Sequence, residues 1–147
     1  MDNLSKSTAP LMPAILFLML LGCSTPSPKA SPAPQPEPEA ISRTEFTNRV
    51  ENYFEYEPLH AGKPSQVRIH LTDLSDGAPV EKAEVTLAVR QKGGAEPVAQ
   101  TTARVGKVTG IYVADLNIPR TGDYDIEFRI KNTKLDERMP LSNFKVE

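Results

Sequence analysis

The residue with the most specific chemistry in this sequence is Cys23, the single cysteine among 147 residues. It follows Leu20-Leu21-Gly22 at the end of a short apolar run. An apolar run that closes on Leu-x-Gly-Cys is the pattern that bacterial lipoprotein signal peptides present to their dedicated peptidase. We therefore expect residues 1–22 to be a lipoprotein signal peptide, Cys23 to be the lipid attachment site, and the mature chain to begin at this residue.

A transmembrane helix is the competing interpretation of the same run. The apolar stretch from Leu11 to Leu21 contains Pro13 and is shorter than the ~20 residues that a bilayer span needs, whereas a signal-peptide core of about 7–15 residues fits it. Ser24 follows the cysteine, which by resemblance to enterobacterial sorting rules favours the outer membrane. We expect a lipid anchor on the periplasmic side of the outer membrane, with the inner membrane and the cell surface as alternatives.

Two histidines and one methionine are the candidate metal ligands outside this anchor. His60, His70 and Met139 would suit a soft or borderline ion such as copper if the fold brought them together. Their spacing contains neither an HxxxH nor a Met-x-Met pair. A turn residue, a strand residue and an edge-packing residue are the ordinary interpretations, so we assign no metal site and no cofactor.

The sequence contains no arrangement that indicates an enzyme. An enzyme needs a positioned nucleophile or an acid-base pair, and the sequence has no Gly-x-Ser-x-Gly motif, no metal-binding histidine motif and no second cysteine. With 17 basic and 19 acidic residues the net charge is −2, and no basic stripe predicts nucleic-acid binding. The remaining carboxylates are typical of a solvated strand face or loop: Glu51, Glu55, Glu57, Asp136 and Glu137.

A proline-rich segment separates the anchor from the rest of the chain. Residues 25–40, TPSPKASPAPQPEPEA, contain six prolines and no large apolar side chain. Such a composition cannot bury enough surface to fold and favours an extended polyproline II geometry, which would span roughly 50 Å. We therefore expect a signal peptide at 1–22, a lipidated N-terminus and linker at 23–42, and one folded domain at 43–147.

The elements of that domain show the two-residue alternation of half-buried strands. Turn signals rich in glycine and proline separate the runs. No window longer than one or two helical turns shows a helical period. About seven short strands of this kind predict an all-β domain, an antiparallel immunoglobulin-like β-sandwich. The expected inward positions are Phe54-Tyr56, Val67-Ile69-Leu71, Ala83-Val85-Leu87-Val89, the weaker Ala99-Thr101-Ala103-Val105, Tyr112-Ala114-Leu116-Ile118, Tyr124-Ile126-Phe128-Ile130 and Phe144-Val146.

Two local features refine this picture. The step Gly122-Asp123-Tyr124 resembles the tyrosine corner of such sandwiches, in which a tyrosine at the start of a late strand bonds back to a nearby connection. If Tyr112 and Ala114 face the core, Ile111 and Val113 lie together on the outer face. Either a neighbouring element covers these two side chains or they form part of a docking surface.

Several segments carry a family resemblance. RVENYFEYEPL at 49–59, AGKPS at 61–65 and HLTDL at 70–74 together resemble the N-terminal β-domain of periplasmic adaptor subunits of heavy-metal RND efflux pumps. There an acidic-aromatic strand leads to a Pro-Leu-x-x-Gly-x-Pro-Ser turn and a His-Leu-Thr-x-Leu strand. The later Gly-Ile-Tyr and Gly-Asp-Tyr steps also resemble the broader YtkA-like group of secreted immunoglobulin-like modules. The resemblance covers most of residues 44–146.

The resemblance implies a partner rather than a reaction. An adaptor continues into a helical hairpin, a lipoyl-like domain and a barrel, and this chain stops at Glu147, so we expect a free-standing version of the adaptor's outer module. The leading hypothesis is a non-enzymatic, lipid-anchored interaction module of the cell envelope, accessory to a heavy-metal (RND) efflux assembly. The alternatives are a periplasmic copper-type metal-binding lipoprotein and a structural or ligand-binding envelope sandwich unrelated to transport.

The anchor can be tested by replacing its acceptor. Cys23→Ala should leave the precursor uncleaved and without an acyl chain, because the thiol is both the acylation site and the new N-terminus. Mass spectrometry of the N-terminus of the protein from membranes measures this. A wild-type protein that begins at any residue other than an acylated Cys23 would contradict the expected localisation.

Overall fold

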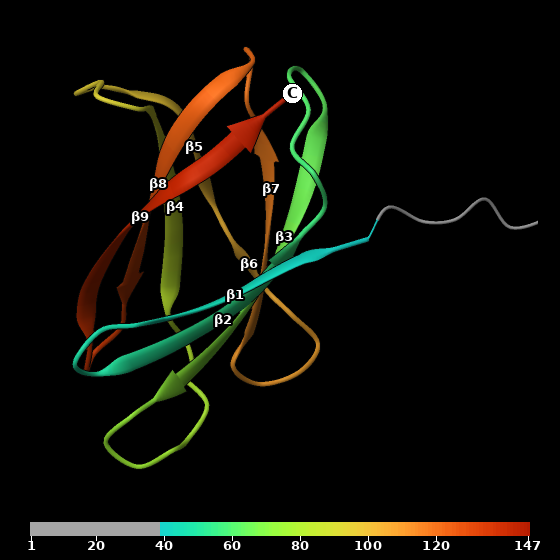
Figure 1. The fold of residues 1–147 in the computed structure, drawn as a ribbon. Coiled ribbons are helices and arrows are strands. Elements are labelled where there is room, and N and C mark those ends of the chain that lie inside the picture. The colour runs from blue at the N-terminus through green and yellow to red at the C-terminus, as the bar shows by residue number, and fades with distance from the viewer. Residues whose placement is uncertain (1–38) are drawn as a thin grey trace, which may run out of the picture. The chain divides into compact units, whose positions relative to one another are not determined.

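The computed structural model describes residues 39–147, and all of its regular elements are strands (Figure 1). Cys23, the expected signal peptide and nearly all of the expected linker lie outside the described residues. Within the described part, no helix is long and apolar enough to cross a membrane. The first strand begins at Ile41, two residues before the expected domain boundary at 43.

Residues 39–147 form nine strands in two antiparallel sheets. The first sheet has the order β1-β2-β3-β7-β6 and the second the order β5-β4-β8-β9. The strands are β1 (Ile41–Phe46), β2 (Val50–Tyr56), β3 (Pro64–Asp73), β4 (Glu84–Gln91), β5 (Pro97–Thr102), β6 (Arg104–Val105), β7 (Ile111–Asn117), β8 (Gly122–Lys131) and β9 (Asp136–Val146).

The strand order is that of an immunoglobulin-like sandwich. Strands β2, β3, β7 and β6 occupy the positions of strands A, B, E and D, and strands β4, β8 and β9 those of strands C, F and G. Strand β5 extends the second sheet beside β4. The predicted all-β, antiparallel immunoglobulin-like sandwich is therefore confirmed.

The core consists of the inward faces of the two sheets, as the alternation predicts. Every second residue of β2, β3, β4, β7 and β8 is buried. An aromatic cluster lies at its centre, with the rings of Phe54 and Phe128 5.0 Å apart between the sheets and Phe144 6.3 Å from Phe54. This packing holds the sheets together, because residues 39–147 contain no cysteine and no tryptophan.

The connection between the two sheets contains the predicted tyrosine corner. Tyr124 is buried near the start of β8, and its hydroxyl donates a hydrogen bond of 2.9 Å to the carbonyl of Arg120. This bond lies in the turn that leads from β7 in the first sheet to β8 in the second. The bond thus fixes the crossing at one end of the sandwich.

The described part of the chain has nine strands, and not the expected seven, for local reasons. The run expected at 99–105 divides at Ala103: its amide still bonds to Val85 in the second sheet, and the next residue, Arg104, pairs with Val113 in the first. The edge strand β9 is longer than its apolar residues Phe144 and Val146 indicate, because its first half is polar.

Strand β1 was not expected, because its sequence ISRTEF lacks apolar alternation. Its inward position is occupied by Arg43, whose guanidinium lies 4.7 Å from the centre of the Phe144 ring. The same group donates a hydrogen bond of 2.9 Å to the carbonyl of Ser142 in β9. Arg43 thus covers the aromatic cluster at the side where β1 of the first sheet meets β9 of the second.

The contrast between the two faces of β8 gives a stability prediction. Phe128→Ala should cost about 3–5 kcal/mol of unfolding free energy, since the ring is 1% exposed and packs on Phe54. Glu127→Ala should change it by at most ~0.5 kcal/mol, because Glu127 lies on the outer face with Arg138 3.8 Å away. Denaturant unfolding measures both, and similar losses would show that the outer face is also part of a core.

Candidate functional site

The structure separates the three candidate metal ligands. His60 is exposed in the turn before β3, and His70 lies six residues into that strand, about 20 Å of strand beyond its first residue, Pro64. Met139 faces the core, where its sulfur lies 3.7 Å from the Asn52 amide nitrogen, whereas His70 lies on the outer face between the buried Ile69 and Leu71. Within residues 39–147, no cluster of histidine and acidic side chains could hold a metal ion.

His70 packs on the outer face of the first sheet. Its ring meets the Tyr53 ring edge to face, with 5.4 Å between centroids, and its neighbour on β7 is Ile111. Ile111 and Val113 are half-buried on this face, with Arg68 and Arg104 on either side of Val113 in the sheet. Neighbouring strands therefore cover part of the apolar pair that the sequence places there.

Two of the acidic residues singled out in the sequence, Glu55 and Asp136, lie beside basic or hydroxyl groups. The Tyr53 hydroxyl donates a hydrogen bond of 2.5 Å to Glu55, and this bond is the main cause that raises the pKa of Tyr53. Arg68 lies 3.9 Å from Glu55, and Arg129 lies 3.4 Å from Asp136. These contacts are those of solvated sheet faces and do not form an acid-base pair.

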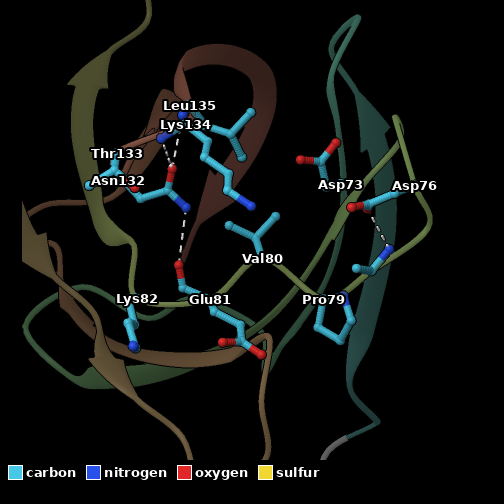
Figure 2. Close-up of a pocket in the computed structure, with 11 residues that line it drawn as sticks. Asp73, Asp76, Pro79, Val80, Glu81, Lys82, Asn132, Thr133, Lys134 and Leu135 are labelled. Carbon is cyan, nitrogen blue, oxygen red and sulfur yellow. Dashed lines mark hydrogen bonds between the residues drawn. The ribbon is translucent and has the colours of Figure 1, made fainter.

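A pocket opens where two loops meet at one end of the sandwich. It has a volume of about 380 Å³ and lies between the β3–β4 connection (74–83) and the β8–β9 hairpin turn (132–135) (Figure 2). We call it the loop-end pocket. In Figure 1 the β3–β4 connection is the lowest loop, and the C-terminus is at the opposite end.

The wall formed by the β3–β4 connection is built from aspartate turns. Asp73 Oδ1 accepts hydrogen bonds from the amide and the hydroxyl of Ser75, at 2.9 and 2.6 Å. Asp76 Oδ1 accepts one of 2.9 Å from the Ala78 amide, next to Gly77 at φ 72°. Aspartate side chains that bond to the backbone two residues on favour such turns.

Tyr112 supports residues 80–83, which lie at the floor of the pocket, from the core side. Its buried hydroxyl donates a hydrogen bond of 2.8 Å to the Val80 carbonyl and accepts one of 3.1 Å from the Ala83 amide. Between these residues Lys82 has φ 51°, a conformation that non-glycine residues adopt only when the surroundings require it. One core side chain thus holds the segment 80–83 in shape.

Asn132 joins the two walls. Its Oδ1 accepts hydrogen bonds from the amides of Lys134 and Leu135, both at 2.8 Å, which shapes the hairpin turn. Its Nδ2 donates a hydrogen bond of 3.0 Å to the Glu81 carbonyl in the other loop (Figure 2). The two loops therefore hold a fixed position relative to each other.

The pocket carries charge of both signs. Lys134 extends from the hairpin wall toward the space, and Asp73 lies on the opposite wall (Figure 2). The pKa of Asp73 is lowered, first by the hydrogen bonds from Ser75 and then by the positive charges of Arg49 and Lys134. Asp73 therefore remains ionised well below neutral pH.

Comparison with known protein families, curated proteins and solved structures finds no match to this chain. The resemblance to efflux adaptor domains thus stays an expectation from sequence. The loop-end pocket was missed from sequence. The glycine and proline within residues 75–79 predict a turn, but nothing in the alternation indicates that this loop meets residues 132–135.

The support beneath the pocket can be tested with a matched pair of tyrosine variants. Tyr112→Phe removes both hydroxyl bonds and leaves the buried Val80 carbonyl and Ala83 amide unpaired, which should cost about 1–3 kcal/mol of stability. Hydrogen exchange should accelerate in residues 78–83. Tyr124→Phe removes the hydroxyl bond at the opposite end and is the control. Equal exchange of 78–83 in both variants would show that Tyr112 does not hold this segment.

Proposed function

We propose that this chain is a non-enzymatic, lipid-anchored interaction module of the bacterial cell envelope that presents the loop end of its sandwich to a protein partner. The lipid on Cys23 would hold it at the periplasmic side of the outer membrane. The sequence pattern at Cys23 supports the anchor, and the direction of β1 supports the presentation.

The observation that carries the proposal is the position of the chain entry. Ile41, the first residue of β1, pairs with Tyr56 beside the start of β3, whereas Phe46 at the other end of β1 pairs with Glu51 near the loop end. The Leu74 amide there bonds to the Arg49 carbonyl. A chain that is anchored ahead of Ile41 would therefore hold the domain at a side of the first sheet that lies away from the loop-end pocket.

The linker composition agrees with a presenting role. Sixteen extended residues before the domain would span roughly 50 Å, which exceeds the length of β3, about 33 Å for its ten residues. The tethered domain would then reach a partner without contacting the lipid surface. A short or apolar linker would not give the domain this freedom.

The resemblance to adaptor domains points to the class of partner. We propose a subunit of a heavy-metal RND efflux assembly, because the adaptor's outer β-domain belongs to such an assembly. The metal-binding alternative is not carried further, since His60, His70 and Met139 lie apart. The immunoglobulin-like fold alone does not decide among partners, because it serves many unrelated functions.

Site-specific crosslinking in cells tests the proposal. A photo-crosslinking residue in place of Thr133, which is exposed in the hairpin turn, should capture one envelope protein, which mass spectrometry identifies. The same residue in place of Thr121, exposed at the opposite end, is the matched control and should capture none. The Thr133 crosslink should be lost when Cys23→Ala is added.

Each outcome bears on a different part of the proposal. A captured subunit of an efflux assembly supports the whole of it, and another envelope protein refutes only the efflux partner. Capture from Thr121 with equal yield, or no capture from Thr133, contradicts presentation of the loop end. Capture that persists without the lipid contradicts the need for the anchor.

A further inference from the structure

The loop-end pocket sets charges of opposite sign on facing walls. Lys134 reaches into the space from the hairpin, and Asp73 and Asp76 line the other wall (Figure 2). Among the ion pairs of residues 39–147, Lys134 takes part in none, and Asp73 pairs only with Arg49, at 3.8 Å. The ammonium group and the two carboxylates are thus left facing the pocket.

The anionic wall keeps acceptor capacity for a ligand. The turns use one oxygen of each aspartate, Oδ1 of Asp73 and Oδ1 of Asp76. Within the described residues, neither Oδ2 atom accepts a hydrogen bond. Two carboxylates against the single guanidinium of Arg49 leave this wall with net negative charge.

The floor between the walls is apolar, and the space is small. Val80 and Leu135 are 2% and 5% exposed beneath the pocket. Glu81 and Lys82 direct their side chains away from the space between Lys134 and Asp73 (Figure 2). A volume of about 380 Å³ lies at the small end of the usual range for ligand pockets, about 300–1,000 Å³.

These features select a ligand with both charges. A simple anion would pair with Lys134 but would bring a like charge toward the aspartates, and a simple cation would leave Lys134 unmatched. We propose that the loop-end pocket binds a small zwitterionic α-amino acid with an aliphatic side chain. Asp76 and Asp73 accept its ammonium group, Lys134 donates to its carboxylate, and its side chain lies over Val80 and Leu135.

Calorimetric titration of the full-length lipoprotein in detergent with L-leucine tests the inference. Saturable binding is expected, and it should weaken by about tenfold or more for N-acetyl-L-leucine, which lacks the ammonium group, and for L-leucinamide, which lacks the carboxylate. No saturable heat at millimolar L-leucine would overturn the proposal. Equal binding of either blocked analogue would overturn it as well.

Variants locate the ligand on the protein. Lys134→Met and Asp76→Asn should each weaken L-leucine binding by about tenfold or more, while Lys145→Met, which removes a lysine at the opposite end of the domain, should not. Thermal unfolding of each variant checks that the domain is folded. Unchanged binding in a folded Lys134→Met or Asp76→Asn variant would place the ligand elsewhere and overturn the proposal.

This inference stands apart from the proposed function. The titration needs neither a lipid bilayer nor a protein partner, whereas the crosslink from Thr133 needs both. Crosslinking without L-leucine binding refutes the inference alone, and L-leucine binding without crosslinking refutes the proposed function alone.

Discussion

The contact on which the rest of this domain depends is the aromatic packing between its two sheets. Phe54 from β2 meets Phe128 from β8 at 5.0 Å, and Phe144 completes the cluster from β9. Immunoglobulin domains of antibodies join their sheets at this level with a disulfide and a tryptophan, and this domain has neither residue type. Buried apolar surface therefore supplies the cohesion between the sheets, and Arg43 covers the cluster at its open side.

The same two-sheet arrangement determines where function can be sought. The connections between antiparallel strands lie at the two ends of the sandwich. The chain enters β1 away from the end that carries the loop-end pocket. The β3–β4 and β8–β9 connections meet at the pocket end, as the corresponding loops do in antibody variable domains. Tyr112 connects the core with the pocket, since its ring lies in the core and its hydroxyl holds residues 80–83. Packing in the core and the shape of the pocket are thus coupled through one side chain.

Much of the fold could be predicted because burial alternates along each strand. The inward residues of β3, β4, β7 and β8 follow directly from the apolar pattern, and the tyrosine corner follows from the glycine and tyrosine at 122 and 124. Strand β1 could not be predicted, because a cationic side chain, Arg43, occupies its inward face. The pocket could not be predicted either, since the hydrogen bond from Asn132 to Glu81 joins residues far apart in sequence.

Resemblance and geometry bear on different questions about this chain. The segments at 49–74 carry the resemblance expected from sequence, and in the structure they form β2, β3 and the turn between them, which serve mainly to build the first sheet. Most of the residues that shape the loop-end pocket, above all Asp76 and Asn132, lie outside those segments, and Asp73 lies in the last of them. A shared sheet can preserve a fold while its loops acquire a different ligand. The resemblance therefore informs the choice of partner assembly, whereas the chemistry of recognition has to be derived from the loops.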